Sequence, residues 1–163
     1  MTLDAFLATV PLFDRLTPEQ RSLIQSYIEV QDIPKDRVLL WEGSQHDAMY
    51  VLWEGRVMVS KKIRGHSEIV IAHLDPPNYF GEVDLLDGQG SSATVTAEVP
   101  CRVLAISQER LRQLLDRDAP LFASFAWALG RSLAGRLRAT NQKVQEVVLW
   151  GLDATGADPA DGG

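Results

Sequence analysis

The chain has 163 residues, the size of one ordinary domain, and its 16 basic and 22 acidic residues give a formal net charge of −6. Hydrophobic residues make up 45% of the chain, enough to bury a core without metal or disulfide support. No apolar run reaches the roughly 18 residues of a membrane span, and the N-terminus lacks the basic start of a signal peptide. The single cysteine, Cys101, cannot form an internal disulfide. We therefore expect a cytoplasmic protein with no membrane segment.

The charge is divided into three blocks along the chain. Residues 1–101 contain 8 basic and 15 acidic residues (net −7), residues 102–143 contain 8 and 3 (net +5), and residues 144–163 contain none and 4 (net −4). The acidic total lacks the positive field that drives non-specific DNA binding. The basic block is interpreted either as a solvated helix face or as a surface for an acidic partner.

Residues 1–30 are predicted to form an N-terminal helical segment. Within it Thr17 can cap a helix, Pro18 suits the first helical position and Gln20 can complete the cap. Residues 31–106 instead contain short apolar runs separated by Gly, Pro and Asp, and Leu-Trp-Glu-Gly occurs twice, twelve residues apart. Regularly spaced short strands with glycine turns predict a β roll or barrel.

The helical period returns at Ser107, a plausible cap, and residues 107–150 are predicted to form C-terminal helices, the longer one over 119–150. A heptad seam runs along the longer helix with a 4-3-4-3 spacing: Leu133, Leu137, Thr140, Val144 and Val147. The seam predicts a homodimer through residues 130–148, and packing of the helix on the chain's own β domain is the alternative. Residues 151–163 are predicted to be a flexible acidic tail.

The stretch with the strongest chemical signal covers residues 80–95. Gly81 permits a tight turn and close approach to a ligand. Residues 82–86 are predicted to form one helical turn whose free N–H groups face an anion, and the Glu82 carboxylate can accept hydrogen bonds from ribose hydroxyls. On these residues alone, a plain surface turn is the alternative.

The pattern Phe80-Gly81-Glu82, then Leu85-Leu86, then Ser92-Ala93-Thr94-Val95 resembles the phosphate-binding cassette of cyclic-nucleotide-binding domains. The spacing of Gly43, Asp47, Tyr50, Val51 and Gly55 is similar to the early β-roll pattern of that family. The segment from Arg136 to Val144 resembles the long helix of the bacterial catabolite activator proteins. The resemblance implies a mainly β fold: a double-stranded β-helix, or jelly-roll-like β roll, with N-terminal helices and a long C-terminal helix.

The resemblance also implies a ligand site for cAMP or cGMP, with no other cofactor. Gly81 and Glu82 then lie at the ribose and phosphate, and Ser92 contacts the phosphate. Thr140 and Asn141 match two residues that contact the base, the second from the partner subunit. The full set of expected ligand-binding residues is Gly81, Glu82, Val83, Ser91, Ser92, Ala93, Thr140 and Asn141.

One position departs from the family pattern. The cassette arginine, which pairs with the cyclic phosphate, is replaced by Ser91. Its loss costs on the order of 2–4 kcal/mol of binding energy. Two hypotheses follow: a stand-alone cyclic-nucleotide sensor that signals through its C-terminal helix, or a degenerate dimeric domain that binds no cyclic nucleotide and acts as a protein-interaction module.

Other functions have less support. No catalytic motif is present, and His46, His66 and His73 do not have metal-ligand spacing, so we expect neither catalytic nor metal-binding residues. Asp84 and Asp87 are interpreted as acids at a helix start rather than as metal ligands. DNA-binding relatives carry a helix-turn-helix after the hinge, where this chain has about a dozen small and acidic residues. The expected partners are therefore a small-molecule ligand, a second copy and a regulated protein, with no DNA binding by this chain.

Overall fold

The computed structural model describes residues 1–63 and 67–155. The helices are α1 (Leu3–Leu7), α2 (Pro18–Gln25), α3 (Glu82–Asp87), α4 (Gln108–Arg117) and α5 (Ala119–Thr155). The strands are β1 (Glu29–Ile33), β2 (Val38–Leu40), β3 (Ala48–Glu54), β4 (Val57–Lys62), β5 (Glu68–Leu74), β6 (Tyr79–Phe80), β7 (Thr94–Ala97) and β8 (Cys101–Ser107).

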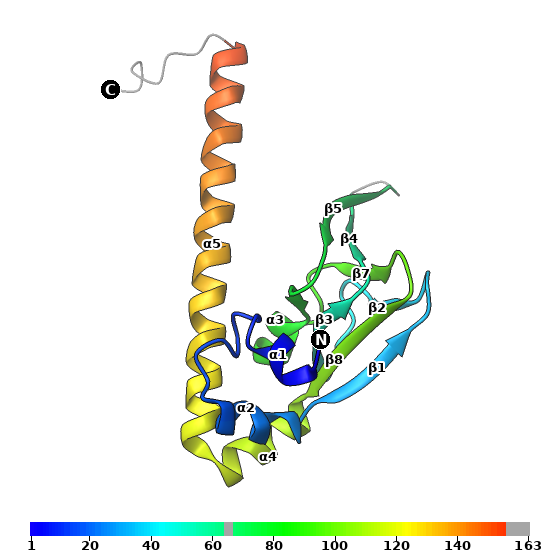
Figure 1. The fold of residues 1–163 in the computed structure, drawn as a ribbon. Helices are drawn as coiled ribbons and strands as arrows, with labels where there is room; N and C mark the ends of the chain where they lie inside the picture. The colour runs from blue at the N-terminus through cyan, green and yellow to red at the C-terminus, as the bar shows by residue number, and fades with distance from the viewer. Residues whose placement is uncertain (64–66, 156–163) are drawn as a thin grey trace, which may run out of the picture.

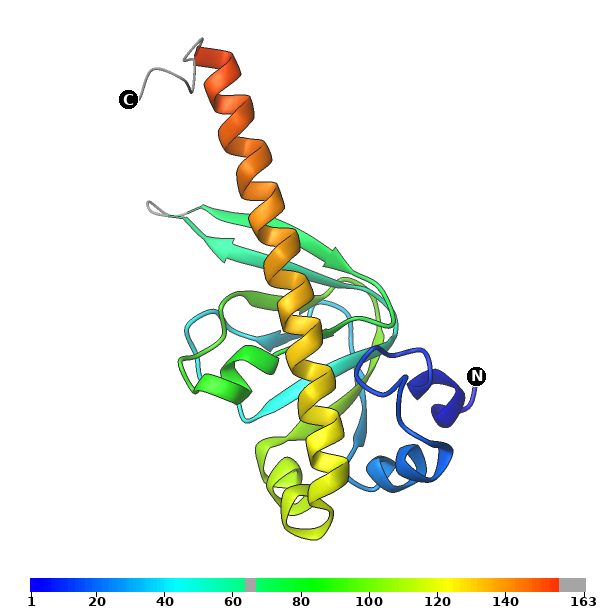
Figure 2. The same ribbon diagram turned by 90° about the vertical axis from the view of Figure 1, so that its left-hand side faces the viewer.

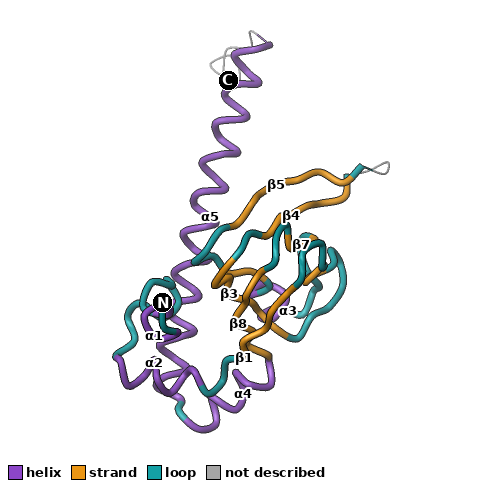
Figure 3. Tube along the Cα trace, turned by 45° about the vertical axis from the view of Figure 1, so that its right-hand side comes forward, coloured by secondary structure: helices purple, strands orange, loops and turns teal. Residues whose placement is uncertain are grey.

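The strands form two antiparallel sheets, with the orders β1-β8-β3-β6 and β2-β7-β4-β5. The sheets face each other as a β roll, with α1, α2, α4 and the start of α5 gathered at one end (Figure 3). The predicted jelly-roll-like fold is confirmed. The segment predicted to be helical over 1–30 contains the two short helices α1 and α2, and β1 begins within its last residues, at Glu29.

Local sequence signals set several helix boundaries. Thr17 and Gln20 form a reciprocal capping box at the start of α2, with Pro18 in the first turn, as predicted. The Ser107 side chain accepts a hydrogen bond from the Arg110 N–H and begins α4. These caps satisfy backbone N–H groups that have no partner within the helix.

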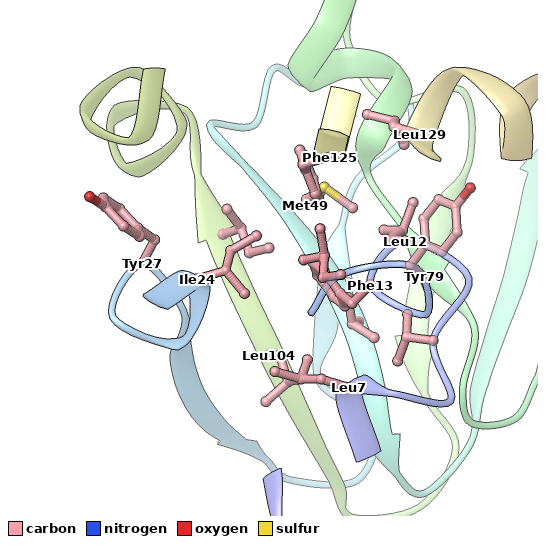
Figure 4. Packing of buried hydrophobic residues seen from close by; sticks show 14 of the residues in the cluster. Leu7, Leu12, Phe13, Ile24, Tyr27, Met49, Tyr79, Leu104, Phe125 and Leu129 are labelled. Atoms are coloured by element: carbon pink, nitrogen blue, oxygen red, sulfur yellow. The ribbon is translucent and has the colours of Figure 1, made fainter. Parts of the chain in front are cut away.

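The core lies in two parts. The larger part joins the N-terminal helices, the β roll and the first turns of α5, with Phe13 stacked on Phe125 at a centroid distance of 5.8 Å (Figure 4). The smaller part fills the space between the two sheets around Leu52, Val57 and Val103. Burial of Phe13 and Phe125 anchors α5 to the rest of the domain.

The helix α5 has two different halves. Leu121, Phe125 and Leu129 are buried, so the first half packs on its own domain. The second half extends beyond the β roll (Figures 1 and 2), and Leu137 and Val147 are more than 60% exposed. The helix continues to Thr155, so the expected tail boundary at residue 151 was wrong; residues 156–163 lie outside the described part. None of the described helices combines the length and apolar character required to span a membrane.

Candidate functional site

A cleft of about 580 Å³ lies between the β roll and α5. Its walls come from α3 and its flanking loops, from the apolar strands β4 and β5, and from one face of α5. The expected ligand residues that line it are Gly81, Glu82, Val83, Ser91, Ser92, Ala93 and Thr140. Asn141 does not line the cleft of its own chain. Residues separated by about 60 positions in the sequence therefore share one cavity, whose volume is typical of a small-molecule site.

The turn into α3 requires glycine. Gly81 has a φ of +85°, in the left-handed region, and a Cβ atom there would lie 3.0 Å from the Ala48 carbonyl oxygen. The helix spans Glu82–Asp87 and ends at Gly88, whose φ is +65°. The predicted short helical turn is confirmed, and it places Glu82 at the base of the cleft.

Glu82 is the buried acid of the cleft, with a side chain only 5% exposed. Arg136 of α5 donates from Nη1 to Glu82 Oε1 at 2.5 Å and from Nη2 to the Tyr79 carbonyl at 2.9 Å. The guanidinium carbon also lies 4.1 Å from the centroid of the Tyr79 ring. Burial raises the pKa of Glu82, and the charge of Arg136 opposes that rise.

Asp84 is also buried, but it binds its own loops. Its carboxylate accepts hydrogen bonds from the His46 N–H at 2.5 Å and from the Gly90 N–H at 2.7 Å. These bonds tie α3 to the two loops that flank it. In the described part of the chain no group of three or more possible ligands could hold a metal ion; His66, one of the three histidines considered, lies outside that part.

The profile of the cyclic nucleotide-binding domain family matches residues 30–118, more than half of the chain. The chain belongs to the cyclic nucleotide-binding domain family. It is 30% identical over 132 residues to the cAMP-activated global transcriptional regulator CRP of Pasteurella multocida, covering 80% of this chain and 60% of that protein. It is 37% identical over 112 residues to a cGMP-dependent protein kinase of Eimeria tenella, covering 69% of this chain and 10% of the kinase.

A solved structure, the catabolite activator protein of Thermus thermophilus, has a TM-score of 0.75 and 31% sequence identity to this chain. The match covers 85% of this chain and 63% of that one. The chain thus spans less than two thirds of these relatives. The family profile ends at residue 118, whereas the structural match covers 85% of the chain. The structural similarity therefore includes part of α5.

In this cyclic nucleotide-binding domain, the side chain of Ser91, the residue predicted to stand in place of the family's arginine, bonds within its own loop. Its Oγ donates to the Ala93 carbonyl at 2.7 Å, and its backbone exchanges hydrogen bonds with residues 43 and 44. Gly90 packs against the same loop, where a Cβ atom would lie 2.8 Å from the Gly43 oxygen. The serine therefore stabilises the loop, whereas the hydroxyl of the exposed Ser92 has no hydrogen-bond partner among the described residues.

The α5 face of the cleft carries three polar side chains. Arg136 binds Glu82, Thr140 Oγ1 donates to the Arg136 carbonyl at 2.9 Å, and Lys143 lies further along the helix. Arg136 and Tyr79 are cleft residues that the local motifs did not indicate. The helical period held a usable signal for Arg136, because it lies four residues before Thr140 and therefore on the same face.

Proposed function

We propose that this domain binds a cyclic nucleotide, cAMP or cGMP, in the cleft between α3 and α5 and acts as a regulatory module. The observation that carries the proposal is the buried Glu82 at the base of a cleft of about 580 Å³, on the cassette turn of a cyclic nucleotide-binding domain. A carboxylate in that position accepts hydrogen bonds from a ribose diol.

The proposed roles follow from the lining. The free oxygen of Glu82 accepts from the 2′-hydroxyl, and the Ser92 hydroxyl and the backbone at Gly81 face the phosphate. The apolar strands β4 and β5 cover the base, and Thr140 contacts its polar edge. Asn141 is exposed and outside the cleft, consistent with a role in the site of a partner subunit.

Relatives with both ligands support this range of ligands. The Pasteurella regulator is described as activated by cAMP, and the Eimeria kinase is described as dependent on cGMP. Either base suits the Thr140 hydroxyl, which can accept a hydrogen bond as it stands and can donate one if it releases the Arg136 carbonyl.

We further propose that the domain is a cytoplasmic homodimer joined through residues 130–148. Along this segment the seam residues Leu137, Val144 and Val147 are each more than half exposed on α5, the pattern of an unpaired heptad seam. Ligand contacts on α5 then shift the helix and change how a regulated protein partner is bound.

One observation favours a second candidate, a protein-interaction module that binds no cyclic nucleotide. Ser91 brings no positive charge to the cassette, and its hydroxyl is already bonded to the Ala93 carbonyl. In this case the exposed face of α5 carries the function alone.

A thermal-unfolding and calorimetric titration with cAMP and cGMP, with 5′-AMP and 5′-GMP as controls, separates the two candidates. A cyclic nucleotide at about 100 times its Kd stabilises the fold by about 2.7 kcal/mol, which gives a clear rise in Tm. Glu82→Ala should abolish the rise. If neither cyclic nucleotide raises the Tm at millimolar concentration, the protein-interaction candidate replaces the sensor.

A further inference from the structure

On the cassette side, the described residues that line the cleft include no cation that could bind an anionic ligand. Among the described lining residues the acids are Glu82 and Asp84, and the cations are Arg136 and Lys143. Asp84 accepts hydrogen bonds from two backbone N–H groups, and both cations belong to α5. A phosphate that enters the cleft therefore finds its positive charge on the helix.

Arg136 is held in place by contacts within the chain. Glu82, the Tyr79 carbonyl and the Tyr79 ring fix the guanidinium, yet only two of its five N–H bonds are used by the contacts described. Its side chain is 42% exposed, and it lines the cleft. Three N–H bonds are left for a ligand, and guanidinium donors suit the geometry of a phosphate.

The chemistry of the ligand places its phosphate near this fork. In a 3′,5′-cyclic nucleotide the phosphate ring is fused to the ribose at the carbon next to the 2′-hydroxyl. A ribose bound by Glu82 therefore holds its phosphate within about one ring's width of the group that is paired with Glu82.

We propose that Arg136 of α5 supplies the cation that binds the ligand phosphate, in place of an arginine in the cassette. This inference rests on the proposed function. The phosphate is thereby bonded to the helix itself, so ligand binding and the position of α5 are linked through one side chain.

Lys143 is the other cation on this face. It lies seven residues after Arg136, about 10.5 Å further along the helix axis. It also lines the cleft, but about one and a half to two helical turns away from the pair with Glu82. Arg136 is therefore the better placed of the two for a phosphate near Glu82, and Lys143 is tested in parallel.

The experiment is a double-mutant cycle on the full chain, read out as the Kd for cAMP and cGMP by calorimetry. The variants are Ser91→Arg, Arg136→Met and the two combined. Loss of Arg136 should weaken binding by about 10- to 100-fold. Ser91→Arg should change wild-type affinity by less than about 3-fold, yet restore most of the affinity lost in Arg136→Met, because either arginine satisfies one phosphate.

Several outcomes overturn the inference. A gain of about 10- to 100-fold from Ser91→Arg in the wild-type chain means that the phosphate has no cation there. If Ser91→Arg increases nucleotide affinity equally in the wild-type and Arg136→Met backgrounds, Arg136 only orders Glu82 and does not bind the phosphate. A larger loss from Lys143→Met than from Arg136→Met assigns the phosphate to Lys143.

Arg138→Met is the matched control, since Arg138 is exposed on α5 and does not line the cleft. If Arg136→Met does not fold, Arg136→Lys replaces it in the cycle. If neither variant folds, the affinity change of Ser91→Arg in the wild-type background decides whether the phosphate already has a cation. Absence of binding in wild type and in Ser91→Arg counts against the proposed function itself, whereas binding gained only with Ser91→Arg counts against Arg136.

Discussion

Asp84 should determine the stability of the cassette more than any ligand contact. Its carboxylate accepts two backbone hydrogen bonds, from His46 at 2.5 Å and Gly90 at 2.7 Å, in a residue only 4% exposed. A hydrogen bond to a charged group contributes about 1.5–3 kcal/mol. Asp84→Ala removes both acceptors and leaves the partly buried N–H groups of His46 and Gly90 without them, so the free energy of unfolding should fall by about 3 kcal/mol.

Urea unfolding at 25 °C and neutral pH measures this loss. Asp84→Asn keeps one acceptor oxygen and should lose about half as much. Asp87→Asn is the matched control, because the exposed Asp87 bonds only within its own turn, and it should change stability by less than about 0.5 kcal/mol. A loss below about 1 kcal/mol for Asp84→Ala would refute the view that this carboxylate holds the loops together.

Two further predictions concern α5 and the acid of the cleft. Leu137→Glu should convert the proposed dimer to a monomer in sedimentation analysis without loss of helical circular dichroism. The control Gln145→Glu lies off the seam and should leave the mass unchanged. A wild-type protein that sediments as a monomer contradicts the proposed seam. Burial raises the pKa of Glu82, and the ionised form is the one proposed to accept the ribose hydroxyl, so cyclic-nucleotide affinity should fall as pH decreases, beginning above the ordinary glutamate pKa of about 4.3. Glu82→Gln should bind the nucleotide weakly and with little pH dependence. An identical pH profile of affinity for both proteins excludes Glu82 as the cause.

The features that the sequence predicted well depend on neighbours in the chain. The Thr17 capping box, the Ser107 cap and the glycine turn at Gly81 are set within a few residues, and each forms as expected. The heptad spacing of α5 likewise predicted a face that its own domain does not cover, since Val144 and Val147 are exposed.

The contacts that the sequence did not predict join distant parts of the chain. Glu82 and Arg136 are 54 residues apart; helical spacing places Arg136 on the same face as Thr140, but nothing in the sequence pairs it with Glu82. The basic block at 102–143 was interpreted as a solvated face or a partner surface, yet one of its cations pairs with a buried acid. Asp84 was interpreted from its place at a helix start, whereas its hydrogen bonds go to two loops that only the folded chain brings together.

The proposed ligand site and the proposed dimer seam share residues, and this has a thermodynamic consequence. Leu137 and Thr140 line the cleft and also belong to the heptad seam. Leu137 is 62% exposed, so a second copy on the seam would cover an open edge of the cleft and bring its own Asn141 towards the base. Two equilibria that share one helix face are coupled, and coupling between binding free energies is reciprocal. If dimerisation increases affinity for the nucleotide, the nucleotide must strengthen the dimer by the same factor. Arg136 binds the β roll directly, so it is the side chain through which the phosphate would set the position of that helix face.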